Sequence, residues 1–231
     1  MEIVKGDSTI SVVIAALNEE EGIGLTIKEI QQVLCDPHLI VVDGKSIDRT
    51  IEIAKNMGAD VLLQEGKGKG DAISQGLKSL NLDERYVVFT DADYTYPAEF
   101  IPKMVEILDQ NPDVGMVVGN RFGLDDKTGK SMKKSFYLGN KLLAFASSTL
   151  NGVKLRDPLS GLRVIRAEIL RDWKPRSKGF DIEAEMNFVV GSRFNIIEMP
   201  IDYRDRLGEK KLKMRDGLAI MKRIMVGPFT N

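Results

Sequence analysis

The sequence predicts an α/β protein built on a mainly parallel sheet with helices on both faces. Through the first half of the chain, short apolar runs alternate with stretches at helical spacing, a pattern typical of parallel strands joined by helices. Polar residues follow directly after several of these runs. The chain has 231 residues, with no internal repeat and no linker rich in proline or serine. We therefore expect one continuous domain over residues 1–231.

The first half supplies the regular part of this pattern. Its expected strands are residues 10–16, 39–43, 59–64 and 85–90, and its expected helices are residues 23–34, a stretch that reaches Met57, and residues 72–80. Ser46 or Asp48 is expected to cap the second helix, because short polar side chains favour that position. The GKGKGD stretch between the third strand and the third helix is expected to form a turn.

The second half is less regular. Its expected helices are residues 97–111, about 136–150 and 178–191, its expected strands are 114–122 and 195–204, and a loop rich in glycine and lysine is expected at 123–135. Near the carboxyl end, apolar residues recur at helical intervals, namely Leu218, Ile220, Met221, Ile224 and Met225. This spacing predicts a terminal helix packed on the core. A helix resting on an anionic membrane surface is the alternative.

Composition restricts the chemistry that this chain can perform. The formal net charge is -1, which gives no reason to expect a nucleic-acid partner. One cysteine, Cys35, cannot form an internal disulfide, which fits a reducing, cytoplasmic compartment. The single histidine, His38, argues against a histidine triad or a histidine-rich zinc site. No apolar stretch approaches the length that crosses a bilayer. Carboxylates, lysines and arginines are therefore the expected reactive groups.

Several polar residues come just after predicted strands. In a parallel sheet, ligands bind beyond the carboxyl ends of the strands, where the strand order reverses. The residues expected to converge at this edge are Asn18, Glu19, Asp43, Lys69, Asp91 and Asp93.

The DAD triplet, residues 91–93, ends the fourth apolar run. Because Asp91 and Asp93 flank Ala92, an extended backbone turns both carboxylates to the same side. Two such charges repel each other unless a positive group lies beside them. Mg²⁺ or Mn²⁺ suits oxygen ligands of this kind, completed by phosphate oxygens and water. A helix cap followed by a solvated turn is the alternative interpretation.

Two turns are weaker candidates for chemistry. The glycine-rich turn before residue 72 could present backbone N–H groups to a phosphate, with Lys69 beside a diphosphate, although it is neither a P-loop nor a dinucleotide fingerprint. A solvated surface lysine is the equal alternative. In DPLSG, residues 157–161, Asp157 is either functional or simply bonded to its own turn.

Taken in order, the motifs SVVIAALNEEEGI, VVDGKSIDRT, GKGKGDA, VVFTDADYTYP, GNRF, DPLSGLR and YRDRLGEKKL resemble the inverting family 2 glycosyltransferases of GT-A fold. Within that family they resemble the dolichyl-phosphate mannose and glucose synthases. The resemblance implies a metal-dependent enzyme that moves a hexose from a nucleotide-diphosphate sugar to a polyprenyl phosphate. The donor remains open among UDP-glucose, UDP-N-acetylglucosamine and GDP-mannose. Residues 1–120 would form the nucleotide-sugar-binding half and residues 121–231 the acceptor half.

The resemblance also implies roles for particular residues. Asp91 and Asp93 would bind the metal, and Asp93, Arg121 and Asp157 would serve catalysis, with Arg121 near the donor sugar. The residues implied in binding the nucleotide and its phosphates are Ala15, Leu17, Glu19, Asp43, Lys69, Asp91, Ala92, Arg204, Arg206 and Lys211. Of these, Asp43 would accept a hydrogen bond from the base, and Arg204 or Arg206, together with Lys211, would close over the phosphates.

The chain departs from the family pattern at three positions. Relatives usually carry Pro and Tyr where Ala15 and Leu17 stand, and Gln where Thr95 stands. The base contact and a third protein ligand of the metal are therefore open. Relatives also often continue into membrane helices, so a soluble member, a peripheral member and a truncated chain are all compatible with an end at Asn231.

Two acceptor classes are compatible with these residues. A polyprenyl phosphate is already ionised at neutral pH and demands no strong base, whereas a sugar or glycerate hydroxyl requires a carboxylate, for which Asp157, Asp181 and Glu183 are the candidates. Lipid phosphate is favoured because the basic carboxyl end and a lysine group, Lys127, Lys130, Lys133 and Lys134, supply charge for an anionic headgroup. We therefore expect a cytoplasmic protein, peripheral on the cytoplasmic face of a membrane.

Two functions other than glycosyl transfer are the alternatives. A nucleotidyltransferase would open with a glycine-rich basic signature after the first strand, which ALNEEEG lacks. A non-catalytic nucleotide-sugar-binding regulator would keep the pocket but release no nucleoside diphosphate.

Overall fold

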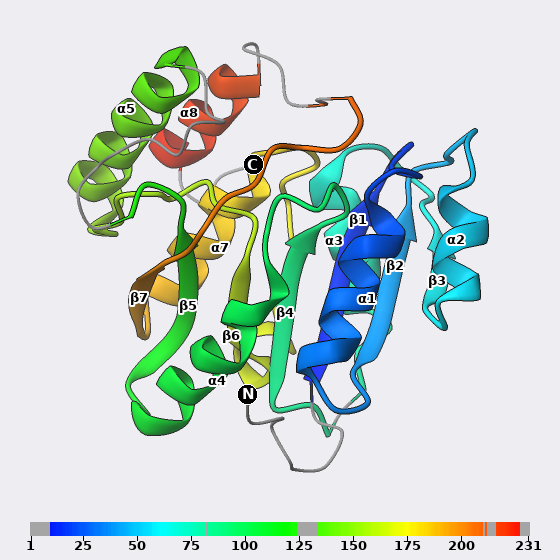
Figure 1. The fold of residues 1–231 in the computed structure, drawn as a ribbon. Helices are drawn as coiled ribbons and strands as arrows, with labels where there is room; N and C mark the ends of the chain where they lie inside the picture. The colour runs from blue at the N-terminus through cyan, green and yellow to red at the C-terminus, as the bar shows by residue number, and fades with distance from the viewer. Residues whose placement is uncertain (1–9, 82, 124–133, 210, 212–215, 227–231) are drawn as a thin grey trace.

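A seven-stranded sheet with the strand order β3-β2-β1-β4-β6-β5-β7 organises the protein (Figure 1). The computed structural model describes residues 10–81, 83–123, 134–209, 211 and 216–226. The strands are β1 (Ile10–Ala16), β2 (His38–Asp43), β3 (Asp60–Leu63), β4 (Tyr86–Asp91), β5 (Val114–Asn120), β6 (Arg163–Arg166) and β7 (Asn195–Pro200). β6 runs antiparallel to its neighbours β4 and β5, and the other neighbouring pairs are parallel. The mainly parallel sheet expected from the sequence is thus confirmed.

Helices cover both faces of this sheet. They are α1 (Ile23–Val33), α2 (Thr50–Asn56), α3 (Lys69–Leu77), α4 (Ile101–Gln110) after a short 3-10 turn (Ala98–Phe100), α5 (Lys134–Asn151), α6 (Ala167–Leu170), α7 (Ile182–Gly191) and α8 (Asp216–Val226). Successive side chains of a strand point to opposite faces, so Val12 joins the apolar layer under α1 and α4, and Val13 joins the layer under α3 and α7. In Figure 1, α1 and α4 lie in front of the sheet and α3 lies behind it.

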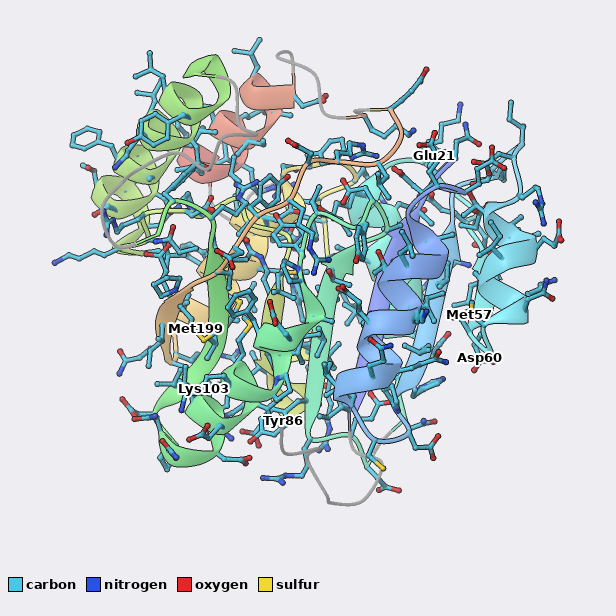
Figure 2. The ribbon with its side chains drawn as sticks, in the orientation of Figure 1. Glu21, Met57, Asp60, Tyr86, Lys103 and Met199 are labelled. Carbon is cyan, nitrogen blue, oxygen red and sulfur yellow. The ribbon has the colours of Figure 1, made fainter. Side chains whose placement is uncertain are left out.

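The order of the strands creates a ligand edge beside β1. β1 pairs with β2 on one side and with β4 on the other, and in this register Ala16 is level with Asp43, and Ala15 with Asp91. Figure 2 shows Glu21, in the segment that follows β1, at the opposite end of the sheet from Tyr86, the first residue of β4. The polar residues after β1, β2 and β4 therefore meet at one edge, as the sequence predicted.

Several local predictions need correction. The last strand, predicted over 195–204, ends at Pro200, and the helix predicted over 178–191 begins at Ile182. α3 begins at Lys69 rather than at residue 72, so Lys69 is its first helical residue and not part of a turn. The N-cap of α2 is Arg49, although Asp48 Oδ1 still accepts the N–H of Thr50 in the first turn. β6 was not predicted, because its four residues are too few to show an alternating pattern.

A separate apolar cluster joins α5, α7 and α8. Ile220 and Ile224 of α8 are buried there with Leu143 of α5, whereas Leu218 and Met225 are exposed. The expectation of a core-packed terminal helix is therefore confirmed for one side of α8 only. Within the described ranges, no helix combines the length and the hydropathy needed to span a bilayer.

Candidate active site

A pocket of about 690 Å³ lies at the carboxyl ends of β1, β2 and β4. The predicted residues that line it are Ala15, Leu17, Lys69, Asp91, Asp93, Arg121, Arg204, Arg206 and Lys211. Four other predicted residues, Glu19, Asp43, Ala92 and Asp157, are buried beside the lining residues and do not form its wall. The structure therefore brings together segments from both halves of the chain.

Asp91 ends β4 in contact with a buried lysine. Lys69 Nζ lies 2.6 Å from Asp91 Oδ1 and 2.6 Å from Glu183 Oε1. Burial alone would lower the pKa of Lys69, but these two carboxylates outweigh it and the pKa is raised. Burial likewise tends to raise the pKa of Asp91, and Lys69 reverses the shift, so that the pKa is lowered. Lys69 is thus a fixed positive charge on the pocket wall.

Asp93 is held by a different set of partners. Its Oδ1 accepts a hydrogen bond from Thr95 Oγ1 at 2.6 Å, and its Oδ2 lies 2.6 Å from Arg206 Nη1. Burial and the neighbouring Asp91 charge raise the pKa of Asp93, against the opposing effect of Arg206. The pKa values of Asp91 and Asp93 therefore shift in opposite directions, as expected for two like charges that share one site.

Glu19 shares the guanidinium of Arg206. Arg206 Nη2 is paired with Glu19 Oε1, while Glu19 Oε2 finds no hydrogen-bond partner in the part of the chain that the structure describes. Burial raises the pKa of Glu19 to about 7, although Arg206 and then Lys211 oppose the shift. Glu19 is therefore a buried carboxyl that Arg206 neutralises only in part.

Residues 201–209, which we call the strap, follow β7 and bring Arg206 to the acidic end of β4. The backbone N–H groups of Arg204 and Leu207 donate to the carbonyls of Thr95 and Asp93, at 3.0 and 3.2 Å. On the outside, Arg204 lies 2.9 Å from Glu29 of α1 and 4.3 Å from the centre of the Tyr94 ring.

Tyr94 completes this outer anchor of the strap. It has a positive φ of 65° and donates its hydroxyl to Glu29 Oε1 at 2.8 Å. The strap is therefore fixed on both sides, with Arg204 held outside and Arg206 inside.

Arg121 follows β5 and is fixed by Asp157. The guanidinium makes two bonds of 2.7 Å to the Asp157 carboxylate, which also accepts the Arg121 backbone N–H at 3.0 Å. Of the three carboxylates considered as bases, Glu183 lines the pocket, Asp157 is fully buried and Asp181 pairs with Arg223 at 3.3 Å. Asp157 is thus placed to orient Arg121.

Asp43 does not line the pocket, contrary to the expectation that it would contact a ligand there. This residue is fully buried, and Ser46 donates to both of its oxygens, at 2.8 Å from the backbone and 2.6 Å from the hydroxyl. Gln64, the residue after β3, lines the pocket instead. The sequence analysis did not select Gln64, although the rule that polar groups follow strands applies to it equally.

The glycine-rich turn does not supply a free phosphate cradle. The N–H groups of Gly70 and Asp71 donate to the carbonyls of Gly179 and Lys178, at 3.1 and 3.2 Å. Glycine is required because a Cβ at residue 70 would overlap the backbone of Ser177. This close crossing explains the glycines structurally, and Lys69 is the group that reaches the pocket.

The residues present fit a divalent cation completed by other ligands. Asp91 and Asp93 offer hard oxygen donors in one pocket, and Mg²⁺ commonly uses one or two carboxylates with phosphate oxygens. No group of three histidine, cysteine or acidic side chains with metal-binding geometry occurs among the residues that the structure describes. Thr95, where a third ligand was in question, instead bonds Asp93.

Several lining residues escaped the sequence analysis. Tyr96 and Tyr203 pack edge to face with ring centres 5.2 Å apart, and both belong to the wall, as do Asn140, Leu159, Phe180 and Ile220. Tyr96 stands close to the DAD triplet and could have been found from that proximity. Tyr203 and Leu159 lie in the YRDRLGEKKL and DPLSGLR motifs and could have been found from them. Asn140, Phe180 and Ile220 come from α5, the loop before α7 and α8, and no local sequence signal connects them to the pocket.

A mainly parallel sheet with paired carboxylates at its switch point, faced by lysine and arginine, defines an α/β protein of the GT-A class. The chain belongs to glycosyl transferase family 2, whose model matches residues 11–173. The family resemblance drawn from the motifs is thereby confirmed, and the protein is a glycosyltransferase.

Among curated relatives, a dolichyl-phosphate hexose transferase of Haloferax volcanii is 37% identical over 221 residues, covering 94% of this chain and 92% of that protein. The low-salt glycan biosynthesis hexosyltransferase Agl6 of the same organism is 33% identical, covering 89% and 50%. A dolichol-phosphate mannosyltransferase of Pyrococcus furiosus is 29% identical, covering 88% and 59%. The chain therefore spans nearly all of the first relative but less than two thirds of the other two.

Among solved structures, a glucosyl-3-phosphoglycerate synthase of Mycobacterium tuberculosis resembles the whole fold. Its complex with Mn²⁺, UDP-glucose and glycerol 3-phosphate has a TM-score of 0.72 at 26% identity, covering 95% of this chain and 78% of that one. The GT-A fold expected from the sequence is confirmed by this similarity.

Proposed function

We propose that this glycosyltransferase moves a hexose from a nucleotide-diphosphate sugar to a polyprenyl phosphate of the dolichyl type. The observation that carries the proposal is the pocket in which Asp91 and Asp93 face Lys69 and Arg206. Such a site suits a ligand that brings both a divalent cation and a diphosphate. The similarity to a dolichyl-phosphate hexose transferase along most of both chains supports the same acceptor class.

In this proposal, residues 1–120 bind the donor and residues 121–231 complete the acceptor side. Asp91 and Asp93 would hold Mg²⁺ or Mn²⁺, which supplies electrostatic stabilisation of the diphosphate when bound. Arg206 and Lys211 would close over the phosphates from the strap side of the pocket, and Arg204, whose guanidinium is paired with Glu29, would hold the strap in place. Ala15 and Leu17, which line the pocket, would border the nucleoside.

The transfer needs charge neutralisation more than proton removal. A phosphate monoester is largely ionised at neutral pH, so its oxygen attacks the anomeric carbon without a general base. The new C–O bond forms as the bond to the diphosphate breaks, and the sugar configuration inverts. Lys69 lies where it can offset negative charge on the departing nucleoside diphosphate, and Arg121, fixed by Asp157, borders the sugar.

The test is a product assay with a panel of donors. The protein is incubated with Mn²⁺, a short-chain polyprenyl phosphate and UDP-glucose, UDP-N-acetylglucosamine or GDP-mannose in turn. One donor is expected to yield a glycosylated lipid phosphate of inverted anomeric configuration together with free nucleoside diphosphate. Formation of a nucleoside triphosphate and a hexose 1-phosphate when pyrophosphate is added would indicate a nucleotidyltransferase. The absence of glycosylated lipid with every donor would overturn this acceptor class.

A soluble hydroxyl acceptor is the second candidate function. It is favoured by Glu183, a carboxylate of the pocket wall that could take a proton from a hydroxyl. The Glu183→Gln variant separates the two candidates, because a hydroxyl acceptor requires that base and a phosphate acceptor does not. The substitution also weakens the bond between residue 183 and Lys69, whichever acceptor is used. The two acceptors are therefore compared with each other in the same variant. Faster turnover with glycerate or a sugar than with lipid phosphate in the wild type would overturn the first proposal.

A further inference from the structure

The outer faces of α5 and α8 carry an apolar surface that the pocket does not use. Leu138, Leu142 and Phe145 of α5 are 71%, 60% and 70% exposed, and Leu218 and Met225 of α8 are 78% and 61% exposed. Within each helix these residues are three, four or seven positions apart, which places them along one face. We call these five side chains the apolar platform.

The exposed platform residues are distinct from the residues with which α5 and α8 pack on the protein. The opposite faces of the same helices are buried, with Leu143 of α5 packed against Ile220 and Ile224 of α8. Figure 1 shows α5 and α8 side by side at one end of the molecule. Among the residues that the structure describes, the other exposed large hydrophobic residues are Leu17, Leu25, Ile47, Leu63, Leu150 and Val226, of which the first four are scattered over other segments. Single exposed apolar residues are ordinary, whereas several along one helix face indicate an interaction surface.

The charges of these helices favour an anionic partner. α5 contains no aspartate or glutamate in its 18 residues, and α8 contains a single one, Asp216, against Lys222 and Arg223. Lys222 of α8 is exposed and lies four residues after Leu218 and three before Met225, and Lys141 of α5 lies 5.5 Å from the Tyr137 ring centre. Leucine, phenylalanine and methionine mixed with lysine are typical of helices that lie in the headgroup region of an anionic bilayer.

The platform and the pocket are two sides of one helix pair. Asn140 of α5 and Ile220 of α8 line the pocket, so the same helices separate it from the platform. We propose that the apolar platform docks on the surface of an anionic lipid bilayer and brings the pocket to an acceptor phosphate anchored there. The role of this docking in catalysis rests on the proposed function. Binding of the protein to the bilayer is nevertheless measured without a sugar donor and without any hexose transfer.

The test is sedimentation of the full 231-residue chain with lipid vesicles. Wild-type protein is expected to bind vesicles of phosphatidylcholine with phosphatidylglycerol. The double variant Leu142→Ser, Phe145→Ser removes two platform side chains and should bind at least about tenfold more weakly. Leu25→Ser, at a position of α1 that is 42% exposed, is the matched control and should bind as the wild type does.

A second variant tests whether the positive charge beside the platform contributes to binding. Lys222→Gln should weaken binding to the anionic vesicles roughly fivefold and leave binding to pure phosphatidylcholine unchanged. Turnover of the double variant with a soluble short-chain acceptor should equal that of the wild type, because neither Leu142 nor Phe145 lines the pocket. That activity control shows that the double variant is folded.

Three results would overturn the proposal. They are failure of the wild type to bind vesicles, equal binding by the wild type and the double variant, and a wild-type dimer in light scattering that the double variant abolishes. The last result would assign the platform to a second copy of the chain. If the variants change vesicle binding as expected but no hexose reaches a lipid phosphate, the docking surface stands and the proposed function fails.

Discussion

The two halves of the molecule contribute opposite kinds of group to the pocket. The half before residue 121 is a regular succession of strands and helices and supplies the acidic tip, Asp91 and Asp93, from the end of β4. The half after residue 120 is irregular and supplies Arg121 and Arg206 from segments that follow β5 and β7. The exceptions are the lysines Lys45, Lys67 and Lys69 from the first half and the carboxylate Glu183 from the second half.

The second half supplies positive charge beside the buried carboxylates of the first half. Two carboxylates one residue apart are costly in a buried place unless positive groups lie beside them. Arg206 reaches Asp93 across 113 residues of sequence, and its position depends on the strap. The proposed donor site is therefore complete only when both halves are folded together. The following variants test this dependence, beginning at Asp93 and moving to residues farther from the pocket.

The largest effect is expected at the acidic tip. Asp93→Asn keeps the shape of the side chain but removes the charge that faces Arg206. We expect the rate of hexose transfer to fall on the order of 10³-fold, because electrostatic groups at the reacting centre contribute this much in other enzymes. Asp172→Asn, at an exposed position, is the control. Retention of the wild-type rate by Asp93→Asn would refute the role of the tip.

The next effect is expected at the inner side of the strap. Arg206→Met removes the guanidinium that bonds both Asp93 and Glu19. We expect the Kd of the nucleotide donor to rise by about 10- to 100-fold, measured by titration calorimetry. Arg49→Met, which removes an exposed pair with Glu52, should leave the Kd unchanged. Unaltered donor affinity in Arg206→Met would mean that the second half does not contribute to donor binding.

A smaller effect is expected at the outer side of the strap. Glu29→Gln weakens the contact with Arg204 without touching the pocket wall, so Glu29 acts as a positioning residue. We expect KM for the donor to rise about three- to tenfold with kcat nearly unchanged. Glu106→Gln, which breaks the surface pair with Lys103, is the matched control. A fall in kcat at constant KM would contradict this positioning role.

The smallest effect concerns pH and Glu19. Burial raises the pKa of Glu19 to about 7. Between the ordinary carboxyl pKa and this value, Glu19 therefore keeps its proton in the folded state and has released it in the unfolded state. The stability that this proton contributes is present in full below the ordinary carboxyl pKa and is lost as the pH rises through 7. Compared with Glu19→Gln, the wild type should lose on the order of 1 kcal/mol of unfolding free energy between pH 5 and pH 8.

Denaturant unfolding of the two proteins at both pH values measures this difference. Because the wild type is compared with Glu19→Gln, the titration of groups that do not interact with Glu19 cancels. Parallel pH profiles for the two proteins would show that Glu19 ionises with its ordinary pKa.

The same contrast explains what the sequence could and could not predict. The strands of the first half are apolar runs with polar residues at their ends, so both the parallel sheet and the gathering of Lys69, Asp91 and Asp93 follow from local pattern. Gln64 obeys the same rule and could have been found with it. The four residues of β6 show no usable period, and their place between β4 and β5 depends on contacts distant in sequence.

The partners of the site residues are only partly a matter of local pattern. Ser46 lies three residues after Asp43, so its two hydrogen bonds to that carboxylate follow the tendency of aspartate to bond its own turn. Nothing in the neighbouring sequence indicates that Asp157 pairs with Arg121, which is 36 residues away. That pair arises from tertiary packing, so Asp157 supports Arg121 in the proposed site, while the base contact of Asp43 stays a prediction.

The central claim is that the tip of β4 binds a cation together with a nucleoside diphosphate. Calorimetric titration of UDP and GDP, with and without Mn²⁺, tests it in the wild type and in Asp93→Asn. We predict that Mn²⁺ tightens binding of one nucleotide to the wild type by at least about tenfold and has little effect on the variant. Equal affinities with and without Mn²⁺ in the wild type, or an equal gain in both proteins, would contradict the account.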